Sequence, residues 1–177
     1  MDNIGKNLLA LRILIIILIL MMTSLHSLYW LYPSTLSGLV TTHDIVDQFG
    51  GFERLNNQQK ILSFIVTMAS VAFLCWAMIL TYRLTLRIGK QEWFDSRTEK
   101  LCLQLGKTLF IYTLARMLEN TLLILILTMT NPEGERALAI TISSSHVVVL
   151  IPAFLSIIAA QMVKAGRLQK EELQQII

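Results

Sequence analysis

Charged residues are scarce in this sequence. Lys, Arg, Asp and Glu make up only 15% of its 177 residues, whereas a soluble domain usually carries about a quarter. Hydrophobic residues make up 54% of the chain, and the net charge is only +3. This balance excludes an ordinary soluble domain. No part of the sequence forms a basic domain large enough to read nucleic acid, so we expect no nucleic-acid partner.

Cysteine, proline and glycine are also few. Cys75 and Cys102 lie in or beside apolar stretches, and neither faces an oxidising compartment in the topology derived below, so we expect no disulfide. Three prolines and eight glycines leave no room for a long disordered linker. We found no internal repeat. The sequence therefore predicts a single domain over residues 1–177.

The short motifs of common catalytic sites are missing. There is no Gly-x-Ser-x-Gly, no His-Glu-x-x-His and no glycine-rich loop for phosphate. The sequence thus favours a protein that is not an enzyme and that uses no cofactor and no metal ion.

Long apolar runs, in contrast, are abundant. A helix needs roughly 20 apolar residues to cross a bilayer, and four runs reach that length, at about 9–32, 60–83, 103–129 and 138–163. The residues after them, 164–177, are charged and favour a helical tail. The predicted fold is all-α, an integral membrane four-helix bundle.

Cations set the predicted topology. With the N-terminus inside, the inner side receives most of the Lys and Arg residues, and the outer side receives only Arg54, Lys60 and Arg136. The positive-inside rule therefore favours cytoplasmic N- and C-termini. Separately, we expect the location to be a bacterial inner membrane. The basic residues between the second and third spans can also contact anionic lipid headgroups.

A polar layer lies inside the third and fourth runs. Arg116 and Glu119 are three residues apart and share one helix face, and either one alone in hydrocarbon costs about 3 kcal/mol. Counting from the turn near Glu133 puts Glu119 level with His146. The predicted layer contains Arg116, Glu119, Asn120, Ser143, Ser144, Ser145 and His146.

Pro152 predicts a break in the fourth helix. Because proline has no N–H, the carbonyl of Val148 loses its helical donor, and Arg116 can donate to that carbonyl as well as to Glu119. Two interpretations of the layer stay open. It fixes helix register, or it binds a ligand, senses protons or carries an ion.

The stretch from Gly89 to Gly106 begins with Gly-Lys-Gln-Glu-Trp-Phe-Asp and contains Leu101, Leu105 and Gly106 near its end. This spacing resembles the loop of the DUF2975 family of small bacterial membrane proteins. The tail after Val163, with Gly166, Leu168 and two acidic residues, is similar to the end of that family. The resemblance implies four spans and no catalytic residues.

The same loop has a physical interpretation. Gly89, Phe94, Asp95 and Gly106 mark a loop and a helix start, with Asp95 or Ser96 as the helix cap. We expect a non-enzymatic signalling, regulatory or immunity-type accessory in the lipid bilayer that contacts a cytoplasmic or membrane protein partner and can oligomerise. The alternative is a small ion or solute conduit through the polar layer.

Overall fold

The computed structural model describes residues 2–32, 44–48, 51–132, 136–140 and 144–176. Within these ranges the chain is helical and contains no strand. Four long helices account for most of it: α1 (Asp2–Leu31), α4 (Asn57–Gly89), α5 (Ser96–Thr128) and α6 (Ser144–Ile176). A short helix α3 (Asp44–Gln48) and a 3-10 turn η1 (Phe52–Arg54) lie between α1 and α4.

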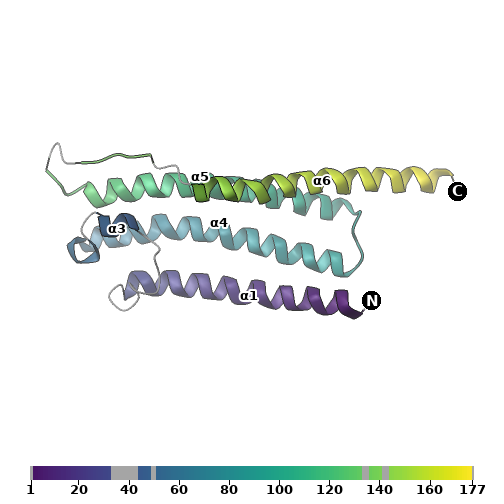
Figure 1. The fold of residues 1–177 in the computed structure, drawn as a ribbon, viewed down its shortest axis with the longest axis horizontal. Coiled ribbons are helices and arrows are strands. Elements are labelled where there is room, and N and C mark those ends of the chain that lie inside the picture. The colour runs from purple at the N-terminus through teal and green to yellow at the C-terminus, as the bar shows by residue number, and fades with distance from the viewer. Residues whose placement is uncertain (1, 33–43, 49–50, 133–135, 141–143, 177) are drawn as a thin grey trace.

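The long helices lie side by side in chain order, as Figure 1 shows. Helix α1 packs against α4, α4 against α5, and α5 against α6. Among the described residues no extensive contact joins α1 to α5 or to α6. The helices therefore form a row in which α5 has a long neighbour on each side, whereas α1 contacts only α4 extensively.

Each long helix is long and apolar enough to cross a membrane. Helices α4, α5 and α6 have 33 residues each, which is about 50 Å at 1.5 Å per residue. The hydrocarbon core of a bilayer is only about 30 Å thick. Their length and composition fit a multi-pass membrane protein, and each of the three is longer than the hydrocarbon core is thick.

Local sequence explains where α4 begins. The backbone N–H of Asn56 donates to the Gln59 side chain (2.9 Å), which forms one half of a capping box. Gln59 is buried, and its amide also donates to the carbonyl of Ile126 (3.0 Å) and the hydroxyl of Thr130 (3.2 Å). One side chain therefore stabilises the start of α4 and the end of α5.

Helix α6 begins at Ser144, later than the predicted start near residue 138. The described residues 136–140 have no regular structure, and Leu138 and Ile140 are exposed. The backbone N–H of Ala137 donates to the hydroxyl of Thr128 (3.2 Å). This bond holds the segment against the end of α5 and draws its backbone out of the helical pattern.

The prediction of a break at Pro152 was wrong. Helix α6 is continuous from Ser144 to Ile176, with Pro152 inside it. Proline removes a backbone donor and crowds the carbonyl of Val148, but helices of the membrane type tolerate it because neighbouring helices and Ser or Thr side chains satisfy the freed backbone groups. The hydroxyl of Ser156 donates to the Pro152 carbonyl (2.8 Å) one turn later.

Aromatic and aliphatic side chains close the end of the molecule where α1 stops. Tyr29 and Trp30 pack edge to face against Phe52, with ring centroids 5.0 Å and 5.1 Å from it. Val46 of α3 is buried with Leu127 of α5. The short elements α3 and η1 thus bury apolar side chains against the ends of the long helices.

Candidate functional site

The predicted Arg116–Glu119 pair is present in the middle of α5. Arg116 Nη1 and Glu119 Oε1 form an ion pair across one helical turn. The Glu119 side chain is 1% exposed and the Arg116 side chain 33%. Shielding by protein is therefore nearly complete for the carboxylate and partial for the guanidinium.

The two members of the pair face different neighbours. Glu119 is directed towards α4, where the Ser70 hydroxyl faces its carboxylate. Its second oxygen, Oε2, is buried and accepts no hydrogen bond within the part of the chain that the structure describes. Arg116 instead lines a cavity of about 130 Å³ between α5 and α6, together with His146. The polar layer is therefore divided between two helix interfaces.

Other predicted members of the layer are placed as follows. His146 is buried on α6, as expected from its depth. Asn120 is half-buried, and within the described residues its side chain forms no hydrogen bond with Arg116 or Glu119. Ser143 lies outside the described residues, and Ser144 and Ser145 open α6 with side chains outside them too.

The predicted bond from Arg116 to the Val148 carbonyl is not formed. Within the described residues Arg116 donates only to Glu119. Val148 lies on an exposed side of α6, with 60% of its surface accessible. The structure brings His146 and Val149 of α6, rather than Val148, to the cavity that Arg116 lines.

Sequence reasoning missed a polar contact at a third interface, between α1 and α4. His26 of α1 lies 3.0 Å from the Thr67 hydroxyl of α4, measured from Nε2. Both His26 and His146 lie within electrostatic range of Arg116. One face of α4 carries small polar residues at helical spacing, namely Ser63, Thr67 and Ser70. This spacing is the feature of the sequence that indicates a face in contact with polar groups of α1 and α5.

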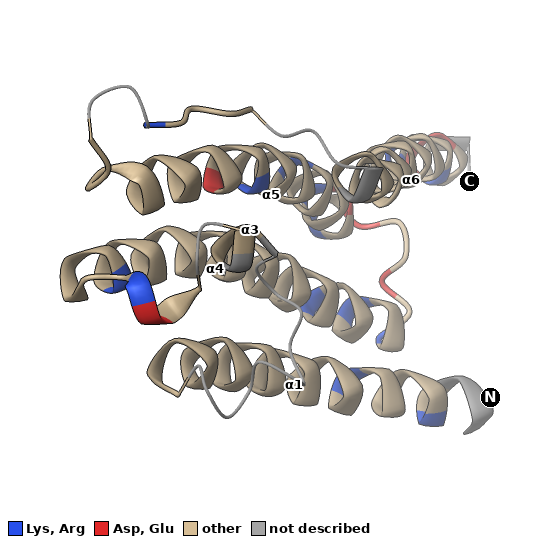
Figure 2. Cartoon of the chain, turned by 60° about the vertical axis from the view of Figure 1, so that its left-hand side comes forward, with Lys and Arg blue, Asp and Glu red and all other residues tan. Residues whose placement is uncertain are grey.

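A second cluster lies at the end of the molecule where α4 stops and α5 starts, which we call the basic end. Figure 2 shows Lys and Arg residues gathered over this end, on the first turns of α1 and the last turns of α4. Arg12 of α1 donates to the Thr85 carbonyl of α4 (2.7 Å). A Cβ at Gly89 would lie 2.6 Å from the Arg12 guanidinium, so glycine leaves room for this contact.

The two segments that resemble the DUF2975 family contact each other at the basic end. A Cβ added to Gly166 of α6 would overlap the Phe94 ring in the α4–α5 loop, so glycine lets the two approach closely. Arg167 Nη2 lies 3.2 Å from Glu99 Oε2 in the first turn of α5. We call this contact the loop–tail junction. It holds the last part of α6 against the loop.

The remaining loop motif residues have structural roles. Asp95 is the N-cap residue of α5 but makes no side-chain capping bond. Its carboxylate instead pairs with Arg87 (3.1 Å). Gly106 permits close packing of α5 on α6, since a Cβ there would lie 2.8 Å from the Ala153 carbonyl oxygen. Asp95 thus marks the helix start, as predicted, while its charge serves the loop.

Comparison with known proteins identifies no relative. No family model matches the sequence, and neither a curated protein nor a solved structure matches it. The DUF2975 resemblance therefore stays a prediction.

In the described part of the chain, no group of three or more His, Cys, Asp or Glu residues is placed to hold a metal ion.

Proposed function

We propose that this chain is a non-enzymatic inner-membrane accessory protein of the signalling, regulatory or immunity type, which acts by presenting its C-terminal helix to a partner protein. The observation that carries the proposal is the projection of α6. Its last turns extend beyond the ends of the other helices (Figure 1), and residues 170–175 are exposed. A helix that is fixed at its base and free at its tip is suited to docking.

The base of this tail is defined by specific contacts. Gly166 packs against Phe94, and Arg167 pairs with Glu99 across helices and with Glu171 one turn on (3.0 Å). Beyond the base, Leu173 is 63% exposed. The tail therefore offers an apolar side chain within a charged helix, at an orientation set by the rest of the fold.

A truncation that spares the junction tests the partner proposal. The full chain, a chain that ends at Gln169 and a Leu173→Glu variant would each be crosslinked in native membranes and purified. We expect a defined protein that crosslinks to the full chain to be lost from both altered chains, because both remove the apolar contact. A Lys164→Gln variant is the matched control and should keep the partner. The same crosslinked proteins in all four samples would overturn the proposal.

The alternative function is a small ion conduit through the polar layer. It is favoured by the buried, unbonded Oε2 of Glu119 and by the cavity that Arg116 shares with His146. Purified protein in liposomes would be assayed for proton and cation flux. A conduit predicts flux that falls at least tenfold in Glu119→Gln and persists in Glu171→Gln, whose carboxylate lies on the tail. Absence of flux, or equal flux in both variants, counts against it.

A further inference from the structure

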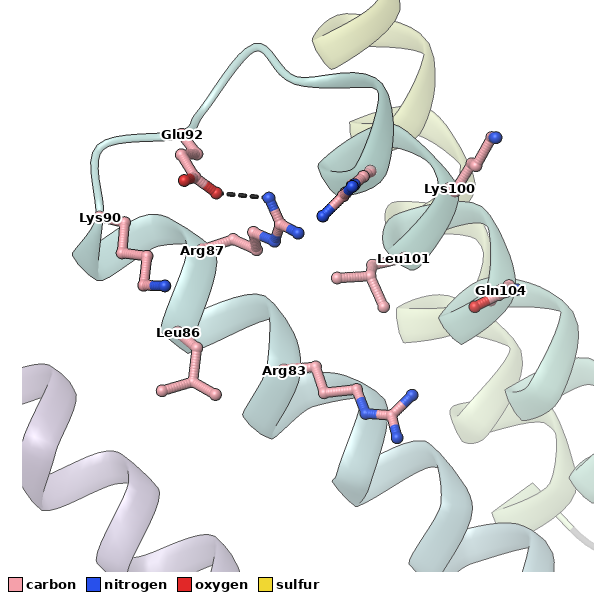
Figure 3. Close-up of a pocket in the computed structure, with 9 residues that line it drawn as sticks. Arg83, Leu86, Arg87, Lys90, Glu92, Lys100, Leu101 and Gln104 are labelled. Carbon is pink, nitrogen blue, oxygen red and sulfur yellow. Dashed lines mark hydrogen bonds and ion pairs between the residues drawn. The ribbon is translucent and has the colours of Figure 1, made fainter.

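A cavity of about 570 Å³ lies at the basic end, between the last turns of α4 and the first turns of α5. Figure 3 shows Arg83, Leu86 and Arg87 on the α4 side and Leu101 and Gln104 on the α5 side. Cations dominate its lining, and among the described lining residues only Glu92 is acidic. The lining cations are Arg83, Arg87, Lys90, Arg97 and Lys100.

Most of this positive charge is uncompensated. Arg87 is engaged by Glu92 and Asp95. Within the described residues, Lys90, Arg97 and Lys100 form no ion pair with any carboxylate. Like charges held around one cavity repel each other, and a bound anion relieves that repulsion. The cations come from two helix ends and the turn between them, so the fold itself brings them together.

The chemistry of the lining favours a phosphate that carries an apolar group. Arginine and lysine bind phosphate oxygens through charge-assisted hydrogen bonds. Leu86 and Leu101 supply apolar wall on the two facing helices. Arg83 also lies over the exposed ring of Trp76, about two turns earlier in α4, with its guanidinium carbon 5.9 Å from the ring centroid. Exposed tryptophan beside arginine is typical of the membrane interface.

We propose that this cavity binds the phosphate of an anionic phospholipid headgroup, with the glycerol and upper acyl carbons against Leu86 and Leu101. Basic residues next to a membrane helix attract anionic lipid in general. This site differs because its cations surround a defined cavity rather than a flat surface. The bound lipid joins the end of α4 to the start of α5 and stabilises the loop on which the tail rests.

The experiment measures lipid binding to the full chain by native mass spectrometry in a neutral detergent. Phosphatidylglycerol and phosphatidylcholine are the two lipid probes. The pocket variant is Lys90→Gln/Arg97→Gln, and the control is Lys164→Gln/Lys170→Gln, which removes two tail cations from outside the cavity. We expect phosphatidylglycerol to bind the full chain in preference, and its affinity to fall at least tenfold in the pocket variant and less than twofold in the control.

Competition distinguishes a lipid from a soluble anion. Inorganic phosphate and glycerol 3-phosphate, each added at millimolar concentration, should not displace phosphatidylglycerol, because neither fills the apolar part of the cavity. Displacement by either would assign the site to a soluble phosphate and overturn the proposal. Equal losses in the pocket and control variants would do the same by showing diffuse attraction, as would equal binding of the two lipids.

A second variant guards against misfolding. Lys90→Gln/Lys100→Gln removes two exposed cations that make no ion pair among the described residues, and it should reproduce the loss seen with Lys90→Gln/Arg97→Gln. Each variant should unfold at the same temperature as the full chain when phosphatidylcholine is the only lipid. If both pocket variants keep that temperature and also keep their affinity for phosphatidylglycerol, the proposal is wrong.

Discussion

Two Arg–Glu ion pairs in this protein differ in burial and in the helices that they join. Arg116 and Glu119 pair within one turn of α5, with the carboxylate fully buried. Arg167 of α6 pairs with Glu99 of α5 at the basic end, where both side chains remain about a quarter exposed. The first pair neutralises charge within the polar layer, and both of its members lie on α5. The second contributes little energy in water, yet it connects the tail to the loop.

The comparison separates energetic cost from structural role. A buried pair is costly to break because the remaining charge loses its partner in an apolar environment. An exposed pair is screened by solvent and salt. The interior pair should therefore govern stability, and the junction pair should govern where the tail lies. The first and last of the three predictions below test this division, and the second tests the packing of α5 on α6; the largest expected effect comes first.

The Arg116→Met substitution should lower the free energy of unfolding by about 3 kcal/mol, since it leaves the Glu119 carboxylate buried without a cation. The double variant Arg116→Met/Glu119→Met should recover most of that loss, because it removes both charges and keeps apolar volume in place. Denaturant titration of purified protein in detergent, followed by circular dichroism, measures both. A double variant as unstable as the single one would show that the layer requires the ion pair itself.

The Gly106→Ala substitution should cost about 2 kcal/mol, a typical overpacking penalty. Its new methyl group would lie 2.6 Å from Ile157 Cγ1 and 2.8 Å from the Ala153 carbonyl oxygen, so α5 and α6 must separate. Gly5→Ala in α1 is the matched control, since nothing lies within 4 Å of its Cβ position. The same titration measures both variants. If Gly106→Ala is as stable as the control, the close contact between α5 and α6 is not part of the native packing.

Much of the architecture could be predicted from the sequence. Length and hydrophobicity identify four helices, and the spacing of Arg116 and Glu119 identifies their pair. These features depend on residues close in the chain. Asp95 at the start of α5 belongs to the same class, since helix starts have local signals.

The arrangement of the helices could not be predicted in the same way. In a membrane-type helix the buried and exposed faces are both apolar, so hydrophobic periodicity does not identify which face contacts a neighbour. The row order, the facing of Glu119 towards Ser70 and the role of His26 depend on all the helices together. The continuous α6 across Pro152 likewise depends on the surrounding helical turns rather than on the proline alone.

The Arg167→Gln substitution should have the smallest effect on stability, because its partners Glu99 and Glu171 are solvent-accessible. It should still change the tail, since it removes the bridge between α6 and the first turn of α5. We expect faster cleavage of the tail by trypsin at Lys170, measured by mass spectrometry, with an unchanged unfolding midpoint.

Lys164→Gln removes a cation that forms no ion pair among the described residues and should leave cleavage at Lys170 unchanged. Because high salt screens the bridge, the unaltered chain in 1 M salt should approach the cleavage rate of Arg167→Gln. If the variant and the unaltered chain are cleaved at equal rates in low salt, packing of Gly166 on Phe94 alone holds the junction, and the contrast between the two pairs is one of energy only.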